Sequence, residues 1–254
     1  MGHTELKEYH LKPATFWGEL IRNQVGKLVN RANLNIEGLN NVESLKSGAI
    51  IVVAPHNGHV DTALVRMAFN KEARKLMFAM AAGDYWERIG WKQLASSVAR
   101  TFPVSRKSGG QALHDLEQIA ALVTAGERVV IFPEGTRSRE DKPMSERRFK
   151  TGLGLLVLMT EGKVPIIPVY LEGSEKLMPP GEILPQFKKG GQPHPVTVRI
   201  GEQIDLSSYV KKPIEEMGRD DIKRERKMIT SFIRAFFLAQ EMKMTEAKEG
   251  VEPY

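Results

Sequence analysis

The stretch IIVVAPHNGHVD, residues 50–61, decides how this chain can fold. It opens with four β-branched residues, which favour a buried strand, and Pro55 ends that strand. His56 then stands at the carboxyl end of a strand, where open α/β sheets place their ligands. If a helix starts near Gly58, Asp61 lies in its first turns, and its carboxylate can fold back onto the imidazole of His56.

The pair formed by His56 and Asp61 suits acid–base chemistry. A carboxylate that holds one imidazole nitrogen fixes the tautomer and leaves the other nitrogen as a base. A plain packing role for both residues explains this pair, taken alone, equally well. A metal site that also uses His59 is the weaker alternative, because the spacing H-N-G-H-V-D does not match H-E-x-x-H and the other histidines are scattered. We therefore predict no metal.

A second stretch, VVIFPEGTRS over Val129–Ser138, again has a strand that runs straight into a turn. Gly135 allows the backbone to turn tightly and to expose N–H groups, and Arg137 adds a guanidinium that can bind phosphate with two hydrogen bonds. The alternative is an ordinary turn that Glu134 caps, with a solvated Arg137. We predict an anion-binding turn.

Two other segments carry weaker signals. Arg106 and Lys107 follow the short apolar run Phe102–Val104 and are candidates for a second phosphate clamp, although two neighbouring basic residues are usually solvated surface. The segment VPIIPV, Val164–Val169, has two prolines around the start of a buried strand, and packing alone explains most of it.

Apolar runs rich in β-branched residues predict the strands of a sheet. They cover Ala49–Ala54, Leu76–Ala81, Arg128–Phe132, Ile166–Leu171 and Val196–Ile200, with a shorter run at Phe102–Val104. A helical pattern over Gln111–Ala125 precedes the third of these runs and ends at Gly126. Near-continuous apolar strands that alternate with helices indicate helices on both faces of the sheet. We predict a single α/β domain with a mixed, mostly parallel sheet.

Amphipathic helices are predicted at both ends of the chain. The first spans about Pro13–Ala32 and carries Trp17 on its apolar stripe, and the second spans about Asp220–Met242. Each stripe can pack on the sheet or lie on a membrane surface, and the phenylalanines of the second favour packing. The predicted division is residues 1–35 with the first helix, 36–210 with the sheet, and 211–254 with the second helix and a polar tail.

Composition and charge exclude several classes of protein. The chain has 254 residues and no cysteine, which excludes disulfides, thiolate metal sites and a cysteine nucleophile. The formal net charge of +6 favours anionic partners. No apolar run reaches the ~18 to 20 residues of a membrane-spanning helix, and the N-terminus lacks the apolar core of a signal peptide. We therefore expect a cytoplasmic protein with peripheral membrane contact.

Several catalytic motifs are absent from the sequence. It contains no G-x-S-x-G nucleophile elbow, no P-loop and no G-x-G-x-x-G, and its basic residues are not interleaved with aromatic ones as in an RNA-binding sheet. We therefore predict no cofactor and no nucleic-acid partner. A base without a side-chain nucleophile, together with anion-binding turns, suits direct transfer of a group to a substrate hydroxyl or amine.

Taken in order, the motifs resemble the blocks of a known family. His56-x4-Asp61, Arg106, Phe132–Ser138 and Val164–Pro168 follow one another like the four blocks of the glycerolipid acyltransferase superfamily, the lysophosphatidate acyltransferase-like proteins. The resemblance spans about residues 38–205 and implies a mixed, mostly parallel sheet wrapped by helices.

The resemblance implies a role for each matching residue. His56 is expected to be the base that takes the proton from the acceptor hydroxyl, with Asp61 as its orienting carboxylate. The acceptor phosphate is expected to bind at Arg106, Glu134, Gly135 and Arg137. Part of the acyl-donor groove is expected at Val164, Pro165, Ile166 and Pro168. Lys150, in a Phe-Lys-x-Gly stretch, is expected to add positive charge.

The resemblance also implies the reaction and the partners. A fatty acyl group would move from acyl-CoA or acyl carrier protein to a lysophospholipid, above all 1-acylglycerol-3-phosphate, at the inner, anionic face of a membrane. The alternatives are another acceptor within the superfamily, such as an amino acid, a lyso-ornithine lipid or a glycolipid, and a non-catalytic module that binds lipid or phosphate.

Three positions depart from the family pattern. Pro55 stands where the family often has Asn, Gly58 where it has Ser, and Arg100 where it usually has Gly. These changes leave the reacting groups in place. The added Arg100 either enlarges the charge of the acceptor site or lies at the surface.

Overall fold

The computed structural model describes most of the chain after the predicted first helix. The described residues are 33–43, 45, 48–58, 60–82, 100–105, 109–138, 142–177, 188–189 and 192–249. The helix predicted over Pro13–Ala32 lies outside them, as do His59, Arg106 and Lys107.

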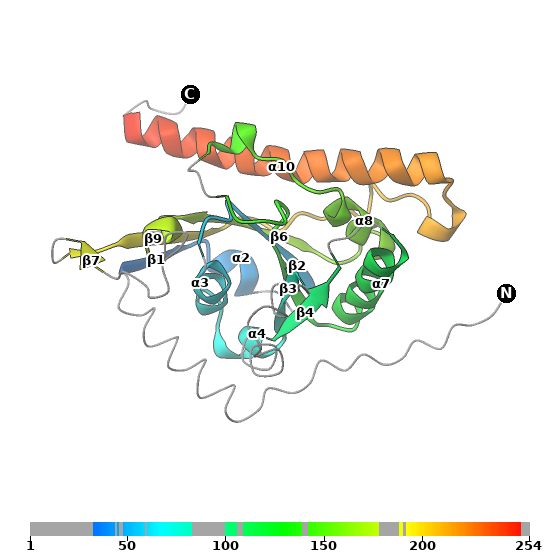
Figure 1. Cartoon of the computed structure of the whole chain (residues 1–254), viewed down its shortest axis with the longest axis horizontal. Coiled ribbons are helices and arrows are strands. Elements are labelled where there is room, and N and C mark those ends of the chain that lie inside the picture. The colour runs from blue at the N-terminus through cyan, green and yellow to red at the C-terminus, as the bar shows by residue number, and fades with distance from the viewer. Residues whose placement is uncertain are drawn as a thin grey trace.

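A seven-stranded sheet forms the centre of the fold, in the order β1-β9-β6-β2-β5-β3-β4 (Figure 1). Its strands are β1 (Asn33–Glu37), β2 (Ala49–Ala54), β3 (Met77–Ala82), β4 (Thr101–Val104), β5 (Arg128–Ile131), β6 (Ile166–Glu172) and β9 (Pro195–Ile200). All neighbours run parallel except β6 and β9. The predicted α/β class with a mixed, mostly parallel sheet is therefore confirmed. A separate ribbon pairs β7 (Lys188–Lys189) with β8 (Gln192–Pro193).

The central strands match their predicted ranges to within one residue because they are buried on both faces. Every residue of β2 is fully buried, which is why its sequence AIIVVA is continuously apolar. Strand β1 was not predicted. Its sequence NLNIE has only two apolar residues, and it lies at the edge of the sheet, where its side chains alternate between exposed and half-buried.

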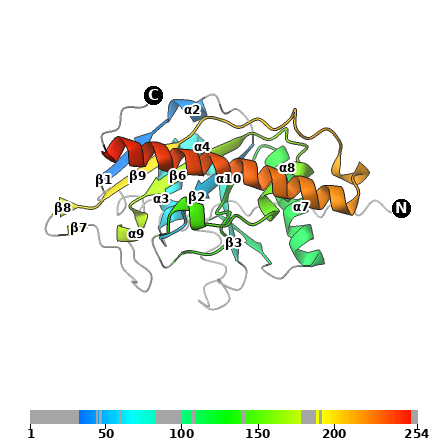
Figure 2. The same cartoon turned by 90° about the horizontal axis from the view of Figure 1, so that it is seen from above.

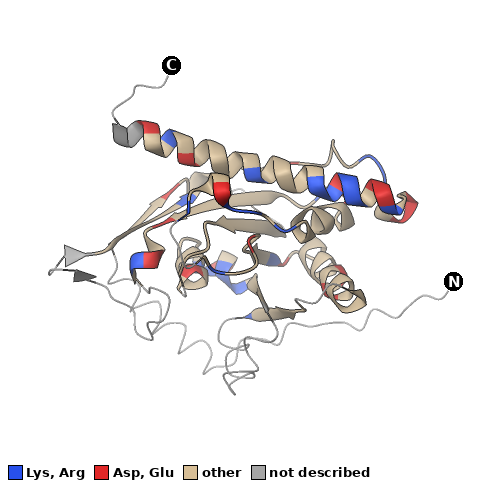
Figure 3. Cartoon of the chain, turned by 45° about the horizontal axis from the view of Figure 1, so that its top comes forward, with Lys and Arg blue, Asp and Glu red and all other residues tan. Residues whose placement is uncertain are grey.

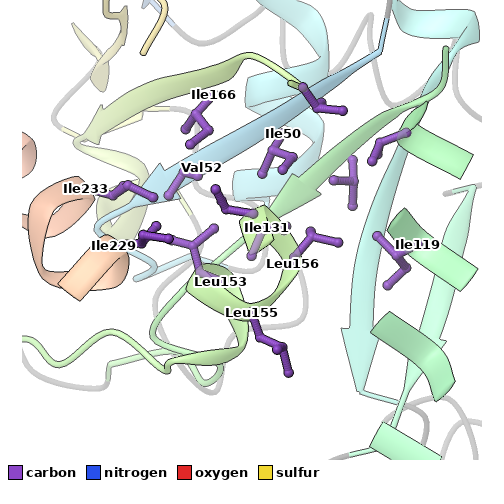
Figure 4. Packing of buried hydrophobic residues seen from close by; sticks show 14 of the residues in the cluster. Ile50, Val52, Ile119, Ile131, Leu153, Leu155, Leu156, Ile166, Ile229 and Ile233 are labelled. Atoms are coloured by element: carbon purple, nitrogen blue, oxygen red, sulfur yellow. The ribbon is translucent and has the colours of Figure 1, made fainter. Parts of the chain in front are cut away.

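Helices cover both faces of the sheet. They are α2 (Asn40–Glu43), α3 (Asp61–Met67), α4 (Lys71–Lys75), α7 (Gly110–Thr124), α8 (Gly152–Met159), α9 (Ser174–Leu177) and α10 (Arg219–Glu249), with short 3-10 turns η1 (Met144–Glu146) and η2 (Ile214–Glu216). Ile50 and Val52 of β2 pack with side chains of α7, α8 and α10 (Figure 4). Ile51 and Val53 point to the opposite face and pack with α3. Because successive side chains of β2 point to opposite faces of the sheet, this strand contributes to both hydrophobic cores.

Helix α10 lies along the sheet as the predicted C-terminal helix, extended to Arg219–Glu249 (Figures 1 and 2). Ile229, Ile233 and Phe237 are buried against the sheet and α8. Phe232 was predicted in the same stripe, but it is 48% exposed. It lies about 100° around the helix from Ile233, which turns it away from the core.

None of the helices in the described part of the chain is long and apolar enough to span a bilayer. The division of the chain into residues 1–35, 36–210 and 211–254 stays a prediction.

Candidate active site

Strand β2 carries His56 to the carboxyl edge of the sheet. Its last residue, Ala54, pairs with Tyr170 of the parallel strand β6, and β5 runs parallel to β2 on the other side. The loops after β2 and β5 therefore leave the sheet next to each other. The backbone N–H of Ser138 donates to the carbonyl of His56 at 2.9 Å and joins the two loops.

The carboxylate of Asp61 folds back onto His56 as expected. Its Oδ2 lies 2.7 Å from Nδ1 of the imidazole. The same oxygen accepts the backbone N–H groups of Asn57 at 3.1 Å and Gly58 at 3.0 Å. Asp61 is fully buried, and the side chain of His56 is 13% exposed. This arrangement orients one imidazole nitrogen and leaves Nε2 as the nitrogen that can exchange a proton.

Helix α3 begins at Asp61, three residues later than the expected start near Gly58. Residues 57 and 58 precede the helix, and their N–H groups donate to the Asp61 carboxylate. A Cβ atom on Gly58 would lie 2.6 Å from Oδ1 of Asp61 and 3.0 Å from the carbonyl oxygen of Ser174. Glycine therefore fits at position 58 of this chain because a larger residue would displace the carboxylate.

The imidazole of His56 is held from its flat side by Phe132. The two ring centroids are 3.9 Å apart, and the rings are inclined by 22°. Phe132 comes directly after β5. The stretch Val129–Ser138 therefore supplies the aromatic ring that packs against His56. The stack and the Asp61 contact together restrict the ring to one orientation.

Glu134 was expected in the phosphate site, but its carboxylate is already bonded within the protein. One oxygen accepts the backbone N–H of His56 at 2.8 Å, and the other pairs with Arg147 at 2.9 Å. The side chains of Arg147 and Glu134 are 2% and 9% exposed. These partners hold the carboxylate against the His56 loop, and the role of Glu134 in the phosphate site stays a prediction.

Arg147 and Arg234 also help to hold Glu134 and the His56 loop in place, and neither was predicted from the sequence. Arg234 of α10 donates to the carbonyl of Arg147 at 2.7 Å and to those of Met144 and Ser145 at 2.9 and 2.7 Å. Arg147 also donates to the carbonyl of Lys142 at 2.7 Å. Helix α10 therefore fixes the segment that carries the partner of Glu134. No local pattern marks such contacts, since Arg234 lies 87 residues from Arg147.

Gly135 forms the turn that was predicted to bind an anion. Its φ of 74° is left-handed, which suits glycine, and its N–H donates to the carbonyl of Phe132 at 2.9 Å. A Cβ atom there would lie 2.6 Å from both Cε and Nζ of Lys150. The exposed Lys150 amine thus lies over the turn, and the half-buried Arg137 follows two residues later. One cation, Lys150, therefore lies over this turn, and a second, Arg137, follows the turn in the sequence.

Arg106, the second of the four motif blocks, lies outside the described residues, but the chain just before it is anchored. The backbone N–H of Ser105 donates to Asp115 of α7 at 2.7 Å. Ser105 follows β4, whose carboxyl end is at the same edge of the sheet as that of β2.

Arg100 does not add charge to the acceptor site. It precedes β4 and so lies at the amino end of the parallel strands, whereas His56 lies at their carboxyl end. Arg100 pairs with Glu127 at 3.1 Å. Its side chain is only 11% exposed, so it is no free surface cation either. Its φ of 44° is left-handed, which agrees with the glycine that the family usually has there.

The block expected in the acyl-donor groove is mostly core. Ile166 pairs with Ile50, four residues before the Tyr170–Ala54 pair, and is therefore about 13 Å along the strand from the His56 edge. Val164 and Pro165 come still earlier in the chain, and the structure does not bring these three residues to His56. The role predicted for them stays untested.

Pro168 of that block lines a cavity of about 160 Å³ between α10 and the sheet. Tyr170, Phe236 and Phe237 also contribute to its wall. Burial raises the pKa of the Tyr170 hydroxyl, and the nearby Glu241 carboxylate raises it further, so the hydroxyl stays neutral.

Known proteins resemble this chain in sequence and in fold. Residues 33–172 match the family model described as Acyltransferase. The chain is 28% identical over 149 residues to 1-acyl-sn-glycerol-3-phosphate acyltransferase LPAT1, chloroplastic, of Arabidopsis thaliana, which covers 58% of this chain and 38% of that protein. It is 27% identical over 183 residues to 1-acyl-sn-glycerol-3-phosphate acyltransferase of Bacillus subtilis (strain 168), with coverages of 69% and 77%.

Among solved structures, the chain resembles the 1-acyl-sn-glycerophosphate (LPA) acyltransferase PlsC from Thermotoga maritima. The TM-score is 0.52 at 18% identity, over 84% of this chain and 78% of that one, which supports the fold. The segment matched by the family model contains the His56–Asp61 pair and the Gly135 turn and makes up more than half of the chain. The chain therefore belongs to the Acyltransferase family, the glycerolipid acyltransferases that its motifs resemble.

Proposed function

We propose that this chain transfers a fatty acyl group from a thioester, acyl-CoA or acyl carrier protein, to the hydroxyl of a lysophospholipid. The observation that carries the proposal is the 2.7 Å contact between Asp61 and His56 at the carboxyl edge of the sheet. Relatives named as 1-acyl-sn-glycerol-3-phosphate acyltransferases support 1-acylglycerol-3-phosphate as the acceptor.

The chemistry follows from the free nitrogen of His56. Nε2 accepts the proton of the acceptor hydroxyl while the oxygen attacks the thioester carbonyl. The new C–O bond forms, the C–S bond breaks, and the thiolate takes the proton back from Nε2. Asp61 stabilises the imidazolium that exists between these two proton transfers. No covalent acyl-enzyme is needed, which agrees with the absence of cysteine and of a serine elbow in the sequence.

The phosphate of the acceptor is proposed to bind at the turn after β5. Lys150 lies over Gly135 there, Arg137 follows it in the chain, and the two loops that carry His56 and Arg137 are joined through Ser138. A guanidinium and an ammonium are the groups that bind phosphate with charge-assisted hydrogen bonds. Arg106 is proposed as a third cation on the basis of its motif. Glu134 is proposed to act through the His56 loop rather than on the phosphate.

Because substrate and product are lipids, the protein is proposed to work as a peripheral protein on the anionic inner face of a membrane. The stripe around Trp17 in residues 13–32 is the proposed anchor. Flotation with phosphatidylglycerol vesicles tests it: Trp17→Glu and high salt should each weaken binding. Full-strength binding of the variant would place the anchor elsewhere.

Release of CoA from a long-chain acyl-CoA tests the function directly. A thiol-reactive dye reads out only the product, because the chain has no cysteine. The acceptors to compare are 1-acylglycerol-3-phosphate, the same glyceride without phosphate, a lyso-ornithine lipid and free amino acids. We expect the phosphate monoester to react fastest. Fastest release with an amine would assign another acceptor, and no release with any acceptor or donor would leave a binding module.

A further inference from the structure

Helix α10 carries a second apolar stripe on the side away from the sheet. Its large members, Met228, Phe232 and Met242, are 52%, 48% and 63% exposed, and Ala235 and Ala239 between them are also exposed. These five residues follow one another at steps of four, three, four and three. The core stripe of Ile229, Ile233 and Phe237 lies on the other side of the same helix.

Steps of alternating four and three residues are typical of a coiled-coil seam. Such a seam is narrower than the apolar face with which a helix lies on a sheet or a membrane. From Met228 to Met242 it is about 21 Å long. Tyr209 adds apolar surface beside Phe232, since its ring lies 5.8 Å from that of Phe232 and is 57% exposed. The stripe therefore fits another helix.

A bilayer fits this stripe less well. The helix has eight basic and six acidic residues, and Figure 3 shows both signs interspersed along it, so it offers no one-signed surface to anionic lipid. In addition, Phe132, which stacks on His56, packs with the core under α3, whereas α10 covers the opposite face. A membrane bound to the outer side of α10 would lie across the sheet from the reacting groups.

We propose that this stripe, Met228–Met242 on the outer side of α10, is a dimer interface that binds α10 of a second copy of this chain in antiparallel orientation. Ala235 then packs against Ala239 of the partner subunit, where small side chains allow the helix axes to approach closely. Phe232 packs against the partner's Met242, a thioether–aromatic contact. The partner's Glu246 comes to lie beside Met228 and next to Lys227, which gives an attractive charge pair. The two-fold axis repeats each contact.

Sedimentation velocity of the full chain over a concentration series tests the proposal. We expect a reversible dimer of the 28.5 kDa chain. Phe232→Glu should weaken it at least about 30-fold, the effect of losing an interface hot spot. Leu113→Glu is the matched control, because Leu113 is 44% exposed on α7 and outside the stripe. A parent protein that stays monomeric, or equal weakening by both variants, would overturn the proposal.

Cross-linking gives a second readout that leaves Phe232 in place. Ala235→Cys introduces the sole thiol of the chain, which a short bis-maleimide should couple to its copy in the partner subunit. Glu117→Cys, on the exposed side of α7, should not couple. A monomer whose introduced thiol resists maleimide would show that another segment of the same chain covers the stripe. Vesicle binding that Phe232→Glu abolishes, without any dimer, would assign the stripe to a bilayer. Either result overturns the proposal.

Discussion

Oδ2 of Asp61 lies 2.7 Å from Nδ1 of His56, and this one oxygen also accepts two backbone N–H groups from the loop between them. The carboxylate therefore shapes the loop and orients the base at the same time. Both tasks need a hydrogen-bond acceptor. The loop presents the backbone N–H groups of Asn57 and Gly58, which are donors, and a base at Nε2 needs the ring proton to be on Nδ1.

Asp61→Asn should remove the negative charge beside His56 while it keeps a hydrogen-bonding group of the same shape. The amide oxygen should take the place of Oδ2, because the backbone N–H groups of Asn57 and Gly58 need an acceptor there, so the variant keeps the hydrogen bond from Nδ1–H and loses the charge that stabilises the imidazolium. We expect turnover to fall about 10²-fold or more. Steady-state kinetics with thermal melting measures it, and a folded variant with nearly parental kcat would contradict a role of the Asp61 charge.

Gly58→Ala should lower both stability and turnover. The added Cβ atom would lie 2.6 Å from Oδ1 of Asp61, and neither that carboxylate nor the Ser174 carbonyl can move freely. We expect a loss of about 1–3 kcal/mol in the free energy of unfolding. Gly110→Ala is the control, since nothing lies within 4 Å of its added Cβ at the start of α7. Equal unfolding midpoints for the two variants would refute the steric argument.

The ion pair between Glu134 and Arg147 predicts strong coupling in a double-mutant cycle. Arg147→Met leaves a buried carboxylate without its partner, which costs about 3–5 kcal/mol. Glu134→Gln leaves the buried guanidinium unpaired, but the double variant removes both charges and should be clearly less unstable than the sum of the single losses. Denaturant unfolding of the four proteins measures the coupling. Additive losses would mean that the two charges do not stabilise each other in the folded protein.

Arg137→Ala should act on the acceptor and not on the donor. A hydrogen bond to a charged group contributes ~1.5–3 kcal/mol, so the acceptor KM should rise about 10- to 150-fold while the acyl-CoA KM stays nearly constant. Lys150→Ala should shift the same constant by less, because its exposed amine is screened by solvent. An equal rise in both KM values would argue against a phosphate site at this turn.

Much of the fold could be predicted because its central strands are continuously apolar. The buried, mostly β-branched runs predicted the range Ala49–Ala54 as observed and the range Arg128–Phe132 to within one residue of the observed Arg128–Ile131. Strand β1 could not be predicted, since its pairing with β9 depends on a partner more than 150 residues away. For α10 the helix was predictable, but the orientation of Phe232 was not, because two apolar stripes overlap in one sequence.

The candidate site, like the fold, could be predicted only in part from the sequence. His56 and Asp61 are five residues apart, so their contact could be inferred from a strand that ends and a chain that turns back. The role of Glu134 could not, because its partners His56 and Arg147 are 78 and 13 residues away and only the folded chain brings them together.

Replacement of His56 tests whether this residue is the base of the acyl transfer. Acyl transfer from a long-chain acyl-CoA to 1-acylglycerol-3-phosphate should be measured for the parent and for His56→Ala, with the thermal unfolding of both as the control for folding. A general base at His56 predicts a loss of turnover of about 10²- to 10⁴-fold, the usual contribution of such a base, at an essentially unchanged melting temperature. Turnover near that of the parent in a folded His56→Ala protein would contradict it.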